Sequence, residues 1–345
     1  MYSPVELIHA ATMLPVGLWG GGNKTEIAHS DSLFQSFICS MVKSTMELGL
    51  TGRLGLMDAV LFQNICDSAR NLASVFHRNL PGVLVDYLHL PQNLQSPSAV
   101  EYLRAELARL KKNLEVLGGE EVGDERLWHS IELYDRLRAL LRALLQLRME
   151  SPQNLSSADL YVLTRAATLL PPEESLPLLQ RALESAASTE ARPRDRVRVV
   201  LEGSFCEQPP LGLIEALEEA GCYIVWDDFH LGWRWFAEGI PRDDDPLLAL
   251  ARSFAHLSVH SSVVHDARER KAAHLLERVR ATGAEGVVIM AAKFCEPALL
   301  DYPLLRRTME ERGIPHLFLE FEEKMWTFEK VRSDVETFVE SLLLE

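Results

Sequence analysis

The spacing of hydrophobic positions divides the chain into three parts. Near the N-terminus, short apolar runs alternate with amphipathic stretches, which is typical of strands and helices that alternate. The expected strands cover residues 14–19, 59–65 and 83–90, and the expected helices cover residues 31–48 and 67–78. This order predicts a βαβ unit with parallel strands.

The middle of the chain has the spacing of long helices. Apolar residues recur at steps of three and four from Val100 to Leu117 and again from Leu127 to Leu144, with Gly118 and Gly119 between the two stripes. The pattern predicts two amphipathic helices packed as an antiparallel hairpin. A coiled-coil partner would also suit such stripes, but short stripes more often pack internally.

The last third returns to alternating strands and helices. Strands are expected at residues 197–203, 222–227, 286–292 and 316–321, with helices at 211–220 and 298–312. We therefore expect an α/β fold with two Rossmann-like, or flavodoxin-like, domains that contain parallel sheets and are joined by a helical middle segment. The expected boundaries are an N-terminal domain over 1–95, a helical hairpin with linking helices over 96–190, and a C-terminal domain over 191–345.

Composition and charge exclude several classes of function. The chain has 345 residues, 47% of them hydrophobic and 25% charged, as in an ordinary globular protein. Its 35 basic and 50 acidic residues give a formal net charge of -15, and no run of lysine and arginine offers a surface for nucleic acid. The apolar stretch 7–22 is interrupted by His9, Thr12 and Pro15 and has no basic flank. It predicts neither a signal peptide nor a membrane span, so we expect a cytoplasmic protein.

Five cysteines are the most informative residues. Cys66, Cys206 and Cys295 each lie at or just beyond the carboxyl end of an expected strand, the edge at which parallel sheets bind ligands. Cys222 opens a strand and is expected to be a buried hydrophobic residue. Cys39 falls inside the expected helix 31–48, where it belongs either to the core or beside Cys66. The spacings match no local metal-binding motif, and a free buried thiol is the ordinary alternative for each residue.

Two other patterns indicate a site less strongly. The stretch GLWGGGNKT at 17–25 differs from a phosphate-binding loop because Asn23 separates Gly22 from Lys24, so we expect a turn after a strand. Glu207, Asp227 and Asp228 lie at strand ends, where carboxylates serve as acids, helix caps or salt-bridge partners.

The sequences around the thiols resemble the 2-hydroxyacyl-CoA dehydratase and benzoyl-CoA reductase family, and most closely the C-type subunits of benzoyl-CoA reductase. Five stretches carry the resemblance: SPVELIHAATMLPVGLWGGG at 3–22, FICSMVKSTMELGL at 37–50, FQNICDSARNL at 62–72, GSFCEQPPLGLIEALEEAGCYIVWDD at 203–228 and KFCEPALLDYPLL at 293–305. They span nearly the whole chain in the family's order, which is more specific than any single motif.

The resemblance implies an iron–sulfur cofactor. In this family three cysteines of a subunit hold a [4Fe-4S] cluster, and the corresponding residues here are Cys39, Cys66 and Cys295. One iron is then left for another ligand or for a substrate oxygen. Cys206 belongs to a matching stretch and is expected near the cluster without being a ligand. Thiolates suit iron because they are soft, anionic ligands.

The resemblance also implies an activity and partners. It predicts an iron–sulfur subunit of an ATP-dependent, ferredoxin-linked benzoyl-CoA reductase, an oxidoreductase of anaerobic aromatic degradation that reduces the ring of an aromatic acyl-CoA. The implied partners are a paralogous iron–sulfur subunit, ATP-hydrolysing activator subunits and ferredoxin as the electron donor. One alternative is a subunit of an (R)-2-hydroxyacyl-CoA dehydratase, which is a lyase. Another is a non-catalytic assembly or electron-relay subunit.

The chain departs from the family pattern in two places. Family members generally carry a further segment before the element that matches SPVELIHAA, so we expect a shortened N-terminus or altered partner contacts. Thr12 stands where the family pattern AAGMLP has glycine, and we expect an altered loop before Gly20.

Overall fold

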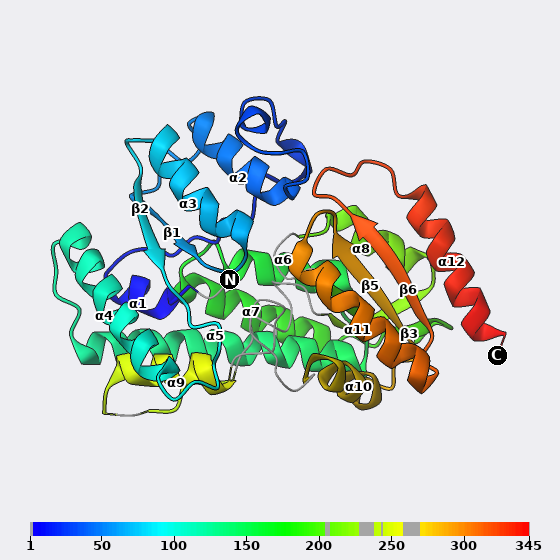
Figure 1. Cartoon of the computed structure of the whole chain (residues 1–345). Helices are drawn as coiled ribbons and strands as arrows, with labels where there is room; N and C mark the ends of the chain where they lie inside the picture. The colour runs from blue at the N-terminus through cyan, green and yellow to red at the C-terminus, as the bar shows by residue number, and fades with distance from the viewer. Residues whose placement is uncertain (1–2, 204–207, 228–237, 243, 258–269, 345) are drawn as a thin grey trace.

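The computed structural model describes residues 3–203, 208–227, 238–242, 244–257 and 270–344 (Figure 1). The described part confirms an α/β protein with parallel sheets. One sheet pairs β1 (Ala59–Gln63) with β2 (Leu84–Leu88). The other has the strand order β4-β3-β5-β6, and all of its strand pairs are parallel. The Rossmann-like arrangement and the boundaries at 95 and 190 stay predictions.

The first unit contains β1, β2 and the helix between them, α3 (Asp67–Asn79), as expected. The predicted strand at 14–19 is wrong. Its segment has no strand partner in the described part of the chain. The Gly17 N–H instead donates to the Thr168 carbonyl at 2.9 Å, and Pro15 has no N–H to give to a sheet.

The predicted helix at 31–48 is divided in two. A short 3-10 helix, η2 (Ser30–Leu33), is followed by a loop and then by α2 (Ser40–Leu50). The buried Glu47 carboxylate, in α2, accepts hydrogen bonds from the N–H groups of His29 and Ser30 at 2.9 and 2.8 Å. These bonds hold the start of η2 against α2. Cys39 therefore stands at the N-cap of α2 and not inside a helix.

The middle segment is helical, as predicted, and both of its long helices have further partners elsewhere in the chain. α4 (Ala99–Gly118) packs against α9 (Pro246–Leu257), while α5 (Asp124–Glu150) packs against α1 (Val5–Ala10) and α7 (Pro172–Ala187). α4 and α5 share one hydrophobic core, which contains Leu107 of α4 and Leu127 and Ile131 of α5, and their antiparallel hairpin stays a prediction. The apolar stripe of α4 is covered by a helix more than a hundred residues later, a pairing that local spacing cannot encode. α6 (Ser157–Ala167) lies between the two sheets (Figure 1).

The second sheet is buried on both faces. Its strands are β3 (Val197–Gly203), β4 (Cys222–Asp227), β5 (Gly286–Ala292) and β6 (His316–Phe321), at the predicted residues. α8 (Leu211–Glu219) and α12 (Glu329–Leu343) pack with Val199 and Leu201 of β3, whereas α10 (Arg270–Thr282), α11 (Glu296–Arg312) and α5 pack with Val200. This alternation follows from the two-residue period of a strand. Cys222 is fully buried, which confirms its expected place in the core.

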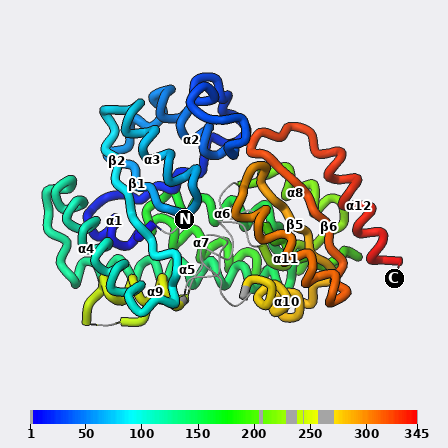
Figure 2. Tube along the Cα trace, in the orientation of Figure 1, coloured from blue at the N-terminus to red at the C-terminus, as the bar shows by residue number. Residues whose placement is uncertain are grey.

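The Cα trace in Figure 2 shows the C-terminal helix α12 on the outer side of the second sheet, away from the N-terminal end of the chain. No helix among the described residues is both long and apolar enough to cross a membrane.

Candidate functional site

The three cysteines singled out by the sequence occupy equivalent places in the fold. Cys39, Cys66 and Cys295 are the N-cap residues of α2, α3 and α11. Cys66 follows β1 after a short turn and Cys295 follows β5, as their predicted positions require. A helix N-terminus presents unpaired N–H groups and partial positive charge, which favour a thiolate or another anion.

The N-termini of these helices meet at one junction. Cys295 contributes to the electrostatic environment of Cys66. Met41, in the first turn of α2, and Ile65, beside Cys66, both pack against the hydrophobic core that contains Cys295. The Glu323 N–H, beyond the end of β6, donates to Ser40 Oγ at 3.2 Å. α2, the helix that begins after Cys39, is thereby tied to the edge of the second sheet.

The thiols lie in apolar surroundings. Cys39 and Cys295 are 5% and 3% exposed, and Cys66 is half-buried. Burial, with a smaller contribution from Cys295, raises the pKa of Cys66 to about 11, although its sulfur accepts the Ala69 N–H at 3.3 Å. Without metal this thiol is neutral, and binding a soft metal requires that it lose its proton.

The donor chemistry fits an iron–sulfur cluster better than a single ion. Among the residues that the structure describes, no group of three or more His, Cys, Asp or Glu is arranged to hold one metal ion. A [4Fe-4S] cluster differs because it is held by soft thiolates at separate irons. Three cysteines on separate helix N-termini are such a donor set. Cys206, Glu207 and Asp228 lie outside the described residues.

A buried carboxylate that the sequence analysis missed connects the two units. Glu323 is 5% exposed and accepts hydrogen bonds from Gly22 N and, at 2.6 Å, from Ser44 Oγ. Burial raises its pKa. Gly20 has a φ of 77°, and a Cβ there would lie 2.4 Å from Glu323 Oε1, so the glycines permit a close approach. The glycine turn, residues 20–22, therefore binds the carboxylate of Glu323 in the same chain. No local pattern distinguishes Glu323 from the neighbouring acidic residues.

A second set of polar side chains lies near the carboxyl edge of the second sheet. Tyr161 of α6 donates to the Pro209 carbonyl at 3.3 Å, and Arg165, one turn later, lies over the Trp19 ring at 5.7 Å from its centroid. Asp227, the last residue of β4, pairs with Arg148 at 3.0 Å. This pairing favours the salt-bridge interpretation of Asp227. The sequence analysis missed Tyr161 and Arg165 because nothing in a helical stripe marks residues that contact distant segments of the chain.

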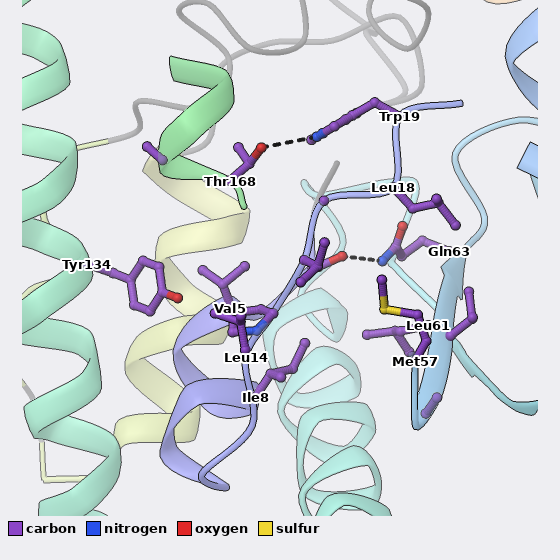
Figure 3. Close-up of a pocket in the computed structure, with 17 residues that line it drawn as sticks. Val5, Ile8, Leu14, Leu18, Trp19, Met57, Leu61, Gln63, Tyr134 and Thr168 are labelled. Carbon is purple, nitrogen blue, oxygen red and sulfur yellow. Dashed lines mark hydrogen bonds between the residues drawn. The ribbon is translucent and has the colours of Figure 1, made fainter. Parts of the chain in front are cut away.

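An apolar pocket lies between the N-terminal segment, β1 and the helices α5 and α6 (Figure 3). The apolar and aromatic residues that Figure 3 labels around it are Val5, Ile8, Leu14, Leu18, Trp19, Met57, Leu61 and Tyr134. Gln63 Nε2 donates to Ser3 Oγ at 2.6 Å, and Trp19 Nε1 donates to Thr168 Oγ1 at 3.3 Å. A second hollow shares Leu18, Trp19 and Leu61 and reaches Met41 and Ala69, in the first turns of α2 and α3. The arrangement suits an apolar group close to the cysteine-bearing helix ends.

Comparison with known proteins decides the family. The family model of the 2-hydroxyglutaryl-CoA dehydratase D-component matches residues 1–342, which is nearly the whole chain. The chain belongs to this family. The resemblance seen in the sequence is thereby confirmed.

Three relatives show how broad the family is. The C-type subunit of benzoyl-CoA reductase from Thauera aromatica is 40% identical over the whole chain and 89% of its own length. The (R)-phenyllactyl-CoA dehydratase beta subunit of Clostridium sporogenes is 27% identical over 99% of the chain and 90% of its own length. The beta subunit of (R)-2-hydroxyglutaryl-CoA dehydratase from Acidaminococcus fermentans is 28% identical, again over 99% and 90%. All three are subunits of enzymes.

Proposed function

We propose that this protein is an iron–sulfur subunit of a benzoyl-CoA reductase, with a [4Fe-4S] cluster held by Cys39, Cys66 and Cys295. The observation that carries the proposal is the position of these cysteines at the N-termini of three helices that meet at one junction. The 40% identity to a benzoyl-CoA reductase subunit supports the reductase branch. When bound, the cluster supplies one-electron transfer to an acyl-CoA.

The chain's own residues have three tasks in this proposal. The N-termini of α2, α3 and α11 stabilise negative charge on the thiolates. The apolar side chains around Cys39 and Cys295 exclude water, which affects both the reduction potential and the lifetime of reduced species. The contacts of Glu323 with Ser44 and Gly22 fix the positions of α2 and the glycine turn relative to the second sheet.

The proposal includes partners and a compartment. We propose a cytoplasmic hetero-oligomer with a paralogous iron–sulfur subunit, ATP-hydrolysing activator subunits and ferredoxin as the electron donor. An aromatic acyl-CoA is the substrate. The names of the relatives, each a subunit of an enzyme, support partner subunits in general.

The cluster is tested by anaerobic purification of the complex of this chain with its partner subunits. We expect about one cubane of iron and sulfide for this chain and a low-temperature EPR signal after reduction. Ser in place of Cys39, Cys66 or Cys295 should remove that iron, whereas Cys222→Ala, which changes a core thiol, should retain it. A folded complex without this iron, or ligand variants with full iron content, would contradict the assignment.

The dehydratase alternative is supported by the 27% and 28% identical relatives. Both activities are measured on one preparation, with benzoyl-CoA and an artificial low-potential reductant in one assay and an (R)-2-hydroxyacyl-CoA in the other. Formation of a cyclic diene from benzoyl-CoA supports the reductase. Loss of water from the hydroxyacyl-CoA without ring reduction supports the dehydratase. A complex that holds the cluster but turns over neither substrate fits an assembly or electron-relay subunit.

A further inference from the structure

A short segment after β6 connects the neighbourhoods of two proposed cluster ligands. On one side, the Lys293 N–H donates at 2.8 Å to the carbonyl of Phe321, the last residue of β6. Lys293 lies two residues before Cys295. On the other side, the Glu323 N–H donates at 3.2 Å to the hydroxyl oxygen of the first residue of α2, which directly follows Cys39. The segment is thus bonded close to each cysteine, and it lies beside α2 (Figure 1).

The side chain of Glu323 holds the same segment to α2. Its Oε2 accepts a hydrogen bond from Ser44 Oγ at 2.6 Å, and its Oε1 accepts one from the Gly22 N–H. Ser44 lies four residues after Ser40, so the two serines lie on one face of α2. Ser44 Oγ also accepts the Gly21 N–H at 3.0 Å. The helix, the glycine turn and the segment after β6 therefore share one hydrogen-bond network.

The network lies in the interior, where water does not replace its bonds. Glu323 and Ser44 are 5% and 1% exposed. A buried donor or acceptor that loses its partner costs free energy, because the group has been removed from water without compensation. The bonds of Glu323 therefore restrict how far α2 moves relative to β6.

Apolar contacts alone would leave the position of α2 less well defined. Cys39 belongs to the core of the first unit, whereas Met41, two residues later, packs against the core that contains Cys295. Hydrophobic contacts have no preferred direction, whereas hydrogen bonds depend on distance and angle. A metal site needs its ligands held to within about 0.5 Å by the residues around them. Glu323 makes directional bonds of this kind next to Cys39.

We propose that Glu323 is a positioning residue of the cluster site: through Ser40 and Ser44 it holds the start of α2, and with it Cys39, in place relative to Cys295. This inference rests on the proposed function for the identity of the cluster. It assigns a task to a carboxylate that lies outside all five sequence stretches on which the family resemblance rests.

The first test needs no iron. The complex is stripped of iron with a chelator, its thiols are alkylated with iodoacetamide, and the rate at each cysteine is followed by mass spectrometry. In Glu323→Ala, Cys39 should react about 10-fold faster than in the unmodified complex, because the start of α2 opens more often. Cys222, in the core of the second sheet, reports general unfolding and should keep its rate. Glu320→Ala, at an exposed site on β6, is the matched control and should change neither rate.

The second test compares two buried serines in the iron-loaded complex. Ser44→Ala removes the hydroxyl that bonds Glu323, and Ser130→Ala removes an equally buried hydroxyl on α5 that lies 2.8 Å from His9 Nδ1. Both variants should lower the Tm by about 2 °C. Only Ser44→Ala should release iron to a chelator faster, by about 3–10-fold, and broaden the EPR signal of the reduced complex. A merely structural role would give both variants the same iron release.

The glutamine variant separates position from charge. In Glu323→Gln the amide oxygen still accepts from Gly22, and the amide nitrogen donates to Ser44 Oγ, whose hydroxyl is free to donate to the Met41 carbonyl at 3.2 Å. Iron release should therefore stay within about twofold of the unmodified complex. A glutamine variant as fast as Glu323→Ala would assign the effect to the charge of the carboxylate and overturn the positioning role.

The outcomes also separate this inference from the cluster assignment. An equal increase of the alkylation rates at Cys39 and Cys222, or no increase at either, overturns the positioning role even if iron is present. A complex that never holds iron contradicts the proposed function, while the alkylation rates still decide whether Glu323 positions Cys39. If Glu323→Ala does not assemble, Ser44→Ala is alkylated in its place, since it removes only one of the bonds.

Discussion

Thr12 has a backbone conformation that residues with a side chain rarely adopt. Its φ is 59°, in the left-handed region, and it lies exposed in the turn after α1. Glycine takes this conformation without steric cost. The family pattern's glycine at this position, noted from sequence alone, therefore has a physical reason, and the threonine keeps the conformation at some cost.

Thr12→Gly should stabilise the chain by about 1 kcal/mol. Removing the Cβ relieves about 1–2 kcal/mol, part of which is offset by the greater freedom of glycine in the unfolded chain. Urea unfolding measures the difference. Thr12→Ala is the control, because it removes the hydroxyl that bonds the Ala11 carbonyl but keeps the Cβ. A glycine variant that is less stable than the alanine variant would contradict this account.

Phe294 is the second residue of this kind, and it lies directly before Cys295. Its φ is 64°, and the Lys293 ammonium lies 5.4 Å from its ring centroid. Strained backbone of this sort persists only where surrounding structure enforces it. Here the strand β5 and the helix α11, on either side, fix the direction in which Cys295 enters the site.

At the scale of elements, the start of α2 depends on one buried carboxylate. Burial opposes ionisation of Glu47, but hydrogen bonds from the His29 side chain and from the backbone of Ser30 and His29 outweigh it and bring its pKa to about 2. The ionised group thereby holds η2 and the loop that ends at Cys39.

Acid should weaken this connection in a defined pH range. The pKa of Glu47 is lowered on folding, from 4.5 to about 2, so its contribution is complete above pH 4.5 and is lost as the pH falls toward 2. The contribution is about 3 kcal/mol. Urea unfolding between pH 2 and 7 should show a flatter curve for Glu47→Gln than for the unmodified chain. Glu125→Gln, at an exposed site on α5, should leave the curve unchanged.

The elements also show where sequence patterns succeed and fail. The four strands of the second sheet lie at the predicted residues, and β4 and β5, which are buried along their whole length, read as nearly continuous apolar runs. The strand at 14–19 has the same apolar character, but its backbone bonds to the end of α6 and not to a sheet. Hydrophobicity encodes burial, and it leaves open which partner supplies the hydrogen bonds.

At the scale of the whole molecule, α5 connects the parts. It packs on α1 near the first unit and on β4 in the second sheet. Near its C-terminal end Arg148, 2% exposed, pairs with Asp227 of β4 at 3.0 Å. This buried ion pair joins the helical middle to the end of β4.

Arg148→Met should destabilise the chain by about 3–5 kcal/mol, because a buried carboxylate loses the guanidinium that compensates its charge. Thermal unfolding of the variant measures this loss. Asp227→Asn in the Arg148→Met background should recover part of it, since the uncompensated charge is then removed. Equal stability of the two variants would show that the charge of Asp227 does not depend on Arg148.

The amino-acid sequence alone was sufficient for the α/β class, the second sheet, the family and the three candidate cysteines. These follow from local periodicity, from the rule that ligands gather at the carboxyl ends of parallel strands, and from motifs spread along the chain. The tertiary structure decided that α4 packs on α9, that Cys39 caps α2, and that Glu323 accepts hydrogen bonds from Gly22 and Ser44. Those features depend on contacts between residues far apart in the chain, where the burial of a polar group is set by its distant neighbours and not by its own segment.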